Sequence, residues 1–326
     1  MHKNPADAGF SLVELMVAMT VMLLISGAAI SALLRMTSTQ ATIWNRTQMH
    51  SGIRGATEVL QQEVGQAGRI ALPPGSPVSL SANSTACTTA AAAPNCTTTF
   101  TVNSTANLFV GERLVVDTAV NQQTVEVTVI PSATTLTVRS ASPSGSVLAH
   151  GNNSPIQVYG AFSAGVIPPL ASPSSYPNGS TGDTLKLFGD INADGNMVYV
   201  EYRCTATATT LGDLTRNVIP WTQTTASLVA TPSQTLLSNI TLNPDLTPCF
   251  TYQTLAVNGT YYVTDVAITL TVQTQQIDPI TKQFQKETKA LLNVSPRNVF
   301  NAWQLAALGM PERVQPTPPT ITALLQ

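Results

Sequence analysis

Charged side chains are scarce in this sequence. They make up 10% of its 326 residues, and the formal net charge is −2 at neutral pH. So small a charge creates no basic field that would attract nucleic acid or an anionic surface over a distance. We therefore expect no direct binding of nucleic acid. The hydrophobic residues, at 43%, are enough for a substantial folded core.

Motifs of catalysis are also missing. The chain contains no G-x-S-x-G sequence, no phosphate-binding glycine loop and no H-E-x-x-H zinc motif. Its three histidines, His2, His50 and His150, are far apart in the sequence. We therefore expect that the protein is not an enzyme.

Cysteine is rare, and no two cysteines form a C-x-x-C pair of the kind that binds zinc or acts in redox chemistry. All four, Cys87, Cys96, Cys204 and Cys249, follow the apolar N-terminal segment. We interpret them as two disulfides formed in an oxidising compartment. Three connectivities are possible, and we favour Cys87 with Cys96 and Cys204 with Cys249, because the first pair closes a short loop and the second would join neighbouring strands. The alternative is four buried free thiols in a cytosolic protein.

Proline is absent between Phe10 and Leu72, which permits one long helix. Residues 10–34 are apolar apart from small hydroxyl residues, Gly27 and Glu14. About 25 residues, rising roughly 1.5 Å each, exceed the hydrocarbon core of a bilayer, which is about 30 Å thick. The segment is too long for a secretory signal peptide and lacks an A-x-A-like cleavage site. We predict that it spans a membrane.

Residues 35–70 continue the helix with an amphipathic pattern. A stop signal follows at Gly68 and at Pro73, Pro74 and Gly75. The apolar positions are spaced by three or four residues and predict a buried stripe made of Met49, Ile53, Ala56, Leu60, Val64 and Ala67.

The distribution of basic residues gives an ambiguous orientation. Lys3 is offset by Asp7 on one side of the apolar segment, whereas Arg35, Arg46 and Arg54 follow on the other. Counted alone, these charges weakly favour the C-terminal side as cytoplasmic. We set this count aside, because the cysteines and the Thr-rich body belong outside the cytoplasm.

Glu14 is the most informative residue of the apolar segment. An ionised carboxylate there costs about 2.5–3.5 kcal/mol on insertion scales, so an acid without a partner is not expected. Cleavage after Gly9 would give Phe10 a free amino group at an i,i+4 spacing from Glu14. The acid would then have a cationic partner, either on its own chain or on a neighbouring one, and the pairing would act in assembly.

Residues 9–14, which read G-F-S-L-V-E, and the long apolar helix after them resemble the prepilin motif of type IV pilins and type II secretion pseudopilins. The resemblance implies that residues 1–9 are a leader, that a prepilin peptidase cleaves after Gly9 and N-methylates Phe10, and that Glu14 corresponds to the family's assembly glutamate. The leader departs from the family in one respect, since Lys3 is its only lysine or arginine and many family leaders are more basic.

Residues 71–300 are rich in Ser, Thr, Asn and Gln, with Pro and Gly between them, and this composition favours β structure. Alternation at Val125, Val127 and Val129 predicts an inserted β module at about residues 98–160. Hairpins are predicted around Asp194-Gly195 and Asn258-Gly259, and a last strand at residues 289–294. Residues 301–326 form the C-terminal tail, and its last part, residues 315–326 with three prolines, is expected either to be disordered or to dock on a partner.

Several later segments resemble large minor pilins of the PilW type, which favours a minor over a major subunit. They are residues 182–185, the hairpin ending at Tyr202, residues 214–216, residues 250–252 and Arg297-Asn298.

One calcium pattern is present. Asp190, Asn192, Asp194, Gly195 and Glu201 match D-x-[DN]-x-[DN]-G-x5-E. Alternation after the glycine indicates a strand, not the helix of an EF-hand, so the first three side chains are better placed as Ca²⁺ ligands than Glu201. The alternative is an ordinary Asp-Gly turn. No other cofactor is expected.

Together these patterns predict an α+β fold, with a long N-terminal helix whose outer half packs on an antiparallel β-rich domain. The resemblance implies a single-pass inner-membrane subunit that joins other major and minor pilins in a type IV pilus, where it reaches the cell surface. The assembled pilus would act in adhesion, twitching motility or DNA uptake. Two alternatives stay open: a type II secretion pseudopilin, and a monomeric membrane-anchored protein that binds a ligand through calcium.

Overall fold

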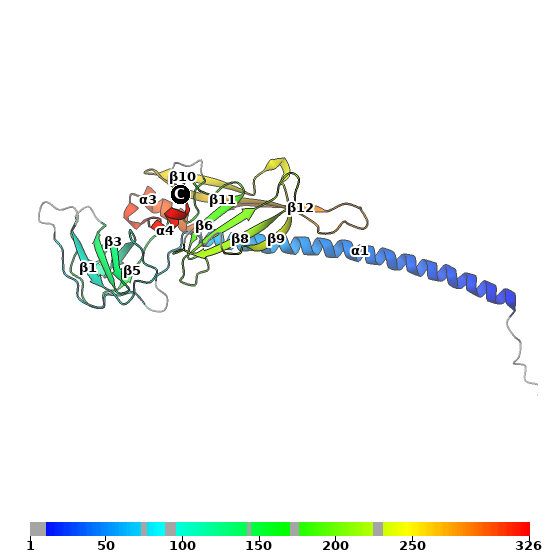
Figure 1. Cartoon of the computed structure of the whole chain (residues 1–326), viewed down its shortest axis with the longest axis horizontal. Coiled ribbons are helices and arrows are strands. Elements are labelled where there is room, and N and C mark those ends of the chain that lie inside the picture. The colour runs from blue at the N-terminus through cyan, green and yellow to red at the C-terminus, as the bar shows by residue number, and fades with distance from the viewer. Residues whose placement is uncertain (1–10, 73–76, 89–95, 142–144, 170–175, 224–230) are drawn as a thin grey trace, which may run out of the picture. The chain divides into compact units, whose positions relative to one another are not determined.

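The computed structural model describes residues 11–72, 77–88, 96–141, 145–169, 176–223 and 231–326. The chain forms two compact units. The helical unit consists of Met1–Ser51 and Gln273–Lys286, and the β-rich unit consists of Gly52–Val272 and Glu287–Gln326. The fold is α+β, with a long N-terminal helix followed in sequence by antiparallel sheets, as the sequence predicts (Figure 1).

Helix α1 (Leu12–Gln66) is one continuous element of 55 residues that begins in the helical unit and ends in the β-rich unit. Its regularity follows from the absence of proline, because no residue interrupts the i→i−4 hydrogen bonds. Within the β-rich unit the apolar positions of α1 are buried as predicted, namely Ile53, Ala56, Leu60, Val64 and Ala67. Met49, the first residue of the predicted stripe, is buried too.

The larger sheet of the β-rich unit is antiparallel and seven-stranded, with the order β10-β11-β9-β8-β7-β6 and with β12 paired to β11. Its hairpins confirm the predicted turns. At the β10–β11 turn Asn258 has φ 50° and Gly259 has φ 79°, the left-handed pair that a two-residue hairpin requires. The strands are β6 (Thr184–Gly189), β7 (Val198–Cys204), β8 (Gly212–Pro220), β9 (Gln234–Thr241), β10 (Phe250–Val257), β11 (Thr260–Gln273) and β12 (Lys286–Val294). A short 3-10 turn, η2 (Pro244–Leu246), lies between β9 and β10.

A second sheet of five strands, with the order β1-β4-β3-β2-β5, lies within the range of the predicted β module. Phe100, Leu114, Val125 and Leu136 are among the residues of its apolar core. The strands are β1 (Thr97–Thr101), β2 (Arg113–Val116), β3 (Gln123–Ser132), β4 (Thr135–Ser140) and β5 (Ile156–Gln157), and the 3-10 turn η1 (Ala119–Asn121) precedes β3.

One detail of the predicted alternation in β3 is wrong. Val125 and Val127 are fully buried, but Val129 is exposed. The pairing of β3 with β4 shifts register between Val127 and Val129, and such an irregularity sends the next side chain to the opposite face. The sequence pattern of period two carries no sign of this bulge.

The C-terminal tail is folded on its own chain. Helix α3 (Arg297–Ala307), the 3-10 turn η3 (Pro311–Arg313) and helix α4 (Pro319–Leu324) follow β12. Ile321, Leu324 and Leu325 are buried in a core cluster that includes Phe162 and Tyr199. The tail is therefore part of the β-rich unit's core, and neither disorder nor a separate partner is needed to explain its sequence.

Candidate functional site

Glu14 lies in the first turn of α1, with its side chain exposed. A carboxylate in this position is favoured by the partial positive charge of the helix N-terminus. Among the residues that the structure describes, no side chain forms an ion pair with Glu14. Gly9 and Phe10, the predicted cleavage and methylation site, lie outside the described residues.

From Leu15 to Leu34, α1 is apolar on all sides apart from small hydroxyl residues. It is long and apolar enough to cross a membrane, and none of its most apolar 18-residue window is buried. Hydroxyl side chains along the helix donate to its own carbonyl groups, as Thr20 does to Met16 O and Ser38 to Leu34 O. These bonds reduce the cost of placing hydroxyl groups in an apolar surrounding, because each donor already has an acceptor.

A second acid of α1, Glu63, has the opposite environment. It is buried beneath the larger sheet, where Arg216 of β8 donates to Oε1 at 2.5 Å and to Oε2 at 3.2 Å. The Tyr202 hydroxyl of β7 donates to Oε2 at 2.5 Å. Burial, followed by the Glu63 charge, raises the pKa of Tyr202 far above its ordinary value, so the phenol stays a donor. The three side chains join the helix to two strands.

The sequence reading missed this cluster. Its only signal was an acid between Leu60 and Val64, next to the predicted buried stripe. The partners are more than a hundred residues away, and pattern analysis along one element does not identify them. Tyr202 and Arg216 lie on β7 and β8, so these two neighbouring strands contribute to the packing of the helix against the sheet.

The end of α1 is fixed by close backbone packing. Gly68 has φ 82°, the left-handed conformation that ends a helix, and its N–H donates to Phe188 O at 2.8 Å. The Asn298 side chain donates to the carbonyls of Gln66 and Ala67 at 3.1 and 3.3 Å. A Cβ on Gly165 would lie 2.2 Å from Gly68 Cα, so glycine is required there. Pro73, Pro74 and Gly75 of the predicted stop lie outside the described residues.

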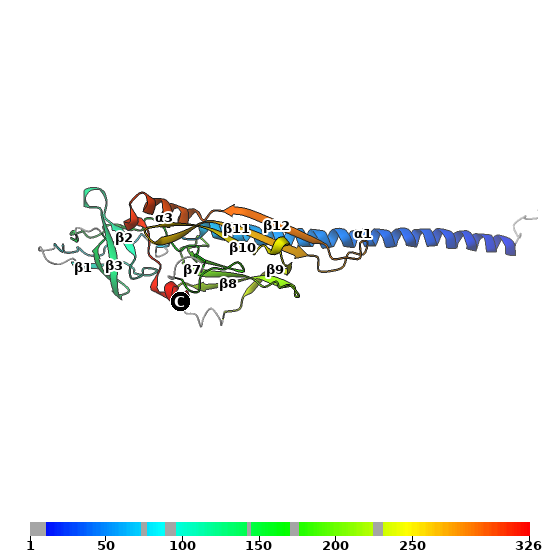
Figure 2. The same cartoon turned by 90° about the horizontal axis from the view of Figure 1, so that it is seen from above.

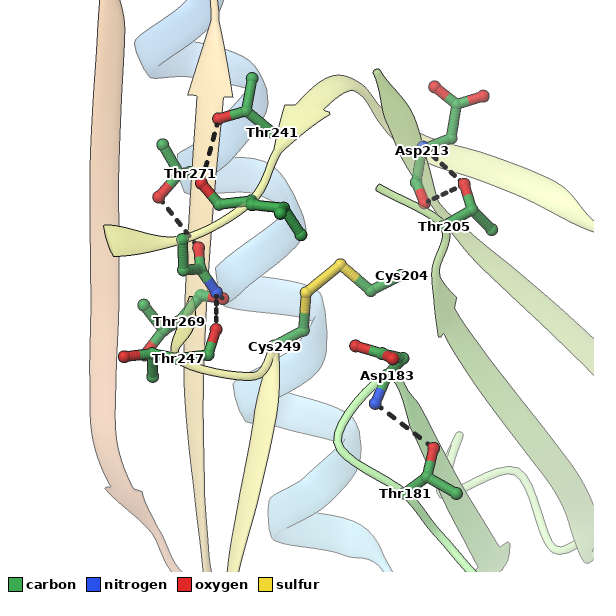
Figure 3. Close-up of a disulfide and its surroundings, with 12 residues drawn as sticks. Thr181, Asp183, Cys204, Thr205, Asp213, Thr241, Thr247, Cys249, Thr269 and Thr271 are labelled. Atoms are coloured by element: carbon green, nitrogen blue, oxygen red, sulfur yellow. Dashed lines mark hydrogen bonds between the residues drawn. A yellow bond between two sulfur atoms is a disulfide. The ribbon is translucent and has the colours of Figure 1, made fainter. Parts of the chain in front are cut away.

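Both favoured disulfides are formed. Cys204, the last residue of β7, bonds to Cys249 directly before β10, with 6.5 Å between the Cα atoms. Figure 3 shows this bond beside the pair of hydrogen bonds between Thr205 and Asp213. The backbone N–H groups of Cys204 and Phe250 donate to consecutive carbonyls, those of Asp183 and Gly182, so the two residues directly before β6 connect the strands that carry the disulfide.

The second disulfide joins Cys87 and Cys96 across nine residues of sequence. Cys87 also exchanges two backbone hydrogen bonds with Val147, each 2.8 Å long. Cys96 directly precedes β1, the first strand of the five-stranded sheet. The disulfide therefore fastens the segment that contains Cys87 to this sheet.

The residues of the calcium pattern are only partly brought together. Asp190 is buried, with Oδ1 accepting from Asp194 N at 3.0 Å and Oδ2 3.4 Å from Arg69 Nε. Asn192 and Asp194 are exposed. Glu201 lies opposite Lys186, three residue pairs from the turn, and its oxygens accept from Tyr199 and Arg203.

Within the described ranges no group of three or more His, Cys, Asp and Glu side chains is arranged to hold a metal ion. The hydrogen bonds are those of an Asp-Gly turn that satisfies its own backbone. Calcium binding itself is not tested by this geometry, which favours the alternative of an ordinary turn.

Two further buried titratable groups are present in the five-stranded sheet region. Glu112 is fully buried; Oε2 accepts from Phe109 N at 3.1 Å, and in the described part of the chain Oε1 has no hydrogen-bond partner. Burial raises the pKa of Glu112 to about 8, although the Phe109 bond lowers it in part. The carboxyl is therefore neutral in the folded protein at pH 7.

His150 is the other group, with Nδ1 3.3 Å from Asp117 Oδ2. The Ser154 hydroxyl donates to the same oxygen at 3.1 Å. A nucleophilic serine must donate to the imidazole. In this cluster Ser154 donates to Asp117 and not to His150. The three side chains therefore lack the Ser–His–Asp arrangement that activates a serine hydroxyl.

An apolar helix with an acid in its first turn, followed in sequence by an antiparallel β-rich domain, is consistent with a pilin-like fold. In agreement, a family model described as the prokaryotic N-terminal methylation motif matches residues 4–30. The chain thus carries a prepilin-type signal, which supports a type IV pilin-like or pseudopilin-like protein. No curated protein and no solved structure shows a significant match to the chain.

Proposed function

We propose that this chain is a minor pilin: a structural, non-enzymatic subunit that takes part in assembling or initiating a type IV pilus. A prepilin peptidase would cleave after Gly9 and methylate Phe10, leaving a mature subunit anchored in the inner membrane by α1. The observation that carries this proposal is the methylation motif directly before an apolar helix with an acid in its first turn.

The proposed assembly chemistry follows from Glu14. Its carboxylate has no ion-pair partner in the described part of the chain, and a charged group surrounded by lipid favours any cation that neutralises it. Cleavage would create such a cation at Phe10. In a filament the amino group of one subunit would meet Glu14 of the next, while their apolar helices pack together.

The β-rich unit supports an extracytoplasmic, minor role. Its two disulfides suit an oxidising compartment. Its two sheets and C-terminal helices make a bulky body, which is easier to accommodate in a few subunits than in every subunit of a thin filament. The subunit would assemble with other minor pilins and with major pilins. Adhesion, twitching motility or DNA uptake would then be properties of the assembled pilus.

The first experiment determines the mature N-terminus by mass spectrometry of protein purified from membranes. We expect a chain that starts at Phe10 and carries one added methyl group. Functional protein at the cell surface that still begins at Met1 or His2, without the methyl group, would contradict the proposal.

The second experiment compares Glu14→Ala with Glu58→Ala, a matched change at an exposed glutamate of the same helix. We expect the first variant to reach the membrane but to be lost from sheared filaments, and the second to be incorporated as wild type. Surface function that survives Glu14→Ala would favour a monomeric anchored binding protein.

The remaining alternative, a type II secretion pseudopilin, shares the motif and the helix. The two are distinguished by whether the chain acts in pilus assembly or in protein secretion. Restoration of piliation in a strain lacking this gene supports the minor pilin, whereas restoration of protein secretion with unchanged piliation supports the pseudopilin.

A further inference from the structure

Besides Met36, which follows the apolar segment of α1, the described part of the helical unit exposes five large apolar side chains beyond that segment. Two are on the helix, Ile43 at 59% and Trp44 at 71% exposure. Three belong to the loop between β11 and β12, residues 274–285, which we call the interfacial loop. They are Ile277 at 52%, Ile280 at 59% and Phe284 at 44% exposure.

The interfacial loop has a well-defined internal structure. Asp278 Oδ1 accepts from the backbone N–H groups of Ile280 and Thr281 at 2.7 and 2.9 Å. Asp278 N donates to Gln283 O at 3.0 Å, and Lys282 N donates to Asp278 O at 2.8 Å. This tight turn exposes Ile280 and Lys282 at its tip.

The same loop is fastened to α1. The Asp278 carboxylate faces Thr42, and the Gln285 side chain contacts both Asp278 and Arg46. Hydrogen bonding to Thr281 N, first of all, lowers the pKa of Asp278, so its carboxylate stays charged and keeps these bonds at neutral pH. Figure 2 shows the tip of the loop beside α1, where the hairpin reaches farthest along the helix.

This attachment sets the height of the loop above a membrane that α1 crosses. Thr42 is eight residues beyond Leu34, the last residue of the apolar run, which corresponds to about 12 Å along the helix. Headgroups extend roughly 5–8 Å beyond the hydrocarbon core on each side. The remaining few ångströms are within reach of the apolar side chains at the tip.

We propose that the interfacial loop forms a second membrane contact, with its tip inserted into the headgroup layer of the bilayer in which α1 is anchored. The inference rests on the membrane anchoring in the proposed function. Lys282, exposed at the tip, supplies a cation for lipid phosphates. An apolar groove of about 490 Å³, lined in part by Ile43, Trp44 and Gln276, is shared by the helix and the loop behind the tip.

The contact would fix the rotation of the subunit about the axis of α1 before assembly. A single helix anchor leaves this rotation free, whereas a second contact off the axis selects one orientation. The face of α1 opposite the loop would then be presented to the next subunit.

Collision measurements with a nitroxide label test the contact in the full chain, reconstituted in phosphatidylcholine–phosphatidylglycerol vesicles. All four native cysteines are in disulfides, so an added cysteine is labelled alone. Labels are placed at Ile280→Cys, at Leu24→Cys in the apolar segment, and at Leu246→Cys, a residue 76% exposed on the β-rich unit. Oxygen, which concentrates in lipid, is compared with a water-soluble nickel chelate.

We expect the ratio of oxygen to nickel accessibility to be several-fold higher at Ile280 than at Leu246. A lipid signal at Leu24 with equal ratios at Ile280 and Leu246 overturns the loop contact and leaves the anchoring intact. A water-like signal at Leu24 contradicts the anchoring itself. A high ratio at Ile280 that appears only after other pilin subunits are added identifies a protein contact and also overturns the proposal.

A variant series makes the test specific. Ile277→Ser combined with Phe284→Ser is expected to lower the ratio at the Ile280 label toward that of Leu246, since both replaced side chains are exposed and the loop's hydrogen bonds are kept. The matched control is Leu242→Ser combined with Leu308→Ser, two exposed leucines of the β-rich unit, and it should change nothing. An equal effect of both pairs would contradict the proposal.

Discussion

The two parts of helix α1 contain the same kinds of residue in different environments. Up to Ser51 the helix keeps its large apolar side chains exposed, apart from Met49, whereas from Gly52 to Gln66 an apolar stripe is buried under the larger sheet. Each part has one acid that is costly to leave alone. Glu63 has two partners in its own chain, and Glu14 has no ion-pair partner within the described residues.

The difference indicates where each part obtains its stability. The second part is stabilised by folding, since its apolar stripe and its acid are satisfied within the β-rich unit. The first part presents a surface that only an external environment can cover, either lipid or the helices of other subunits. Substitutions in the two parts should therefore affect different measurements.

The largest effect is expected for Glu63→Ala. Removing one partner of a buried ion pair leaves the other charge uncompensated, here Arg216, and costs about 3–5 kcal/mol. Urea unfolding of the detergent-solubilised chain, followed by near-UV circular dichroism, measures this loss. Glu14→Ala should leave the same transition unchanged. Equal destabilisation by the two variants would show that the two parts of the helix do not differ in where they obtain their stability.

Removal of the Cys204–Cys249 disulfide, by replacing both residues with serine, is expected to cost about 4 kcal/mol in the chain-entropy treatment. The matched variant without Cys87–Cys96 should lose about 2.7 kcal/mol, because it opens a much shorter loop. The sequence separations are 45 and 9 residues. Midpoints of unfolding, measured without reductant, compare the two. A larger loss from the shorter loop would show that local packing outweighs chain entropy.

A smaller effect, which depends on pH, is expected from Glu112. Because burial raises its pKa from 4.5 to about 8, folding takes up a proton between these values. Stability should fall as the pH rises through this window, by about 2 kcal/mol between pH 6 and 7.5. Glu112→Gln should remove this part of the pH dependence, measured as unfolding midpoints at the two pH values. An unchanged slope would mean that Glu112 is ionised in the folded protein.

The smallest effect is expected from calcium. The Asp190 carboxylate is already engaged by Arg69 and by the turn, so millimolar calcium should give no heat of binding and no shift of thermal melting. Titration calorimetry of the full chain tests this expectation. A saturable heat signal that disappears in Asp194→Asn would instead establish a site at the turn.

Patterns within single elements were readable from the sequence. The period of the stripe at Leu60 and Val64 predicted the buried face of α1, and Asn258-Gly259 predicted its hairpin turn. The favoured cysteine pairs were also found. For the helix face, the turn and the short Cys87–Cys96 loop, neighbouring residues contain the physical cause. Cys204 and Cys249, 45 residues apart, meet only through the packing of distant strands.

Features that depend on contacts between residues distant in sequence could not be predicted from the sequence. Glu63 and Arg216 meet only after two elements have packed, and the bulge at Val129 follows from the pairing of β3 with β4. The tail prolines suggested disorder, yet Ile321 and Leu324 fill part of a core whose other members come from the middle of the chain. For Glu14 the limit is different, since its proposed partner is created by processing or belongs to another subunit.

The uninterrupted backbone of α1 also has a mechanical consequence. In the proposed filament, a pulling force would act along the helices of the subunits, and in this chain it would be transmitted through one series of peptide hydrogen bonds from Leu12 to Gln66. It would then pass to the strands through Glu63 and to α3 through Asn298. These two attachments, and not the apolar stripe alone, would bear the shear when such a fibre is retracted.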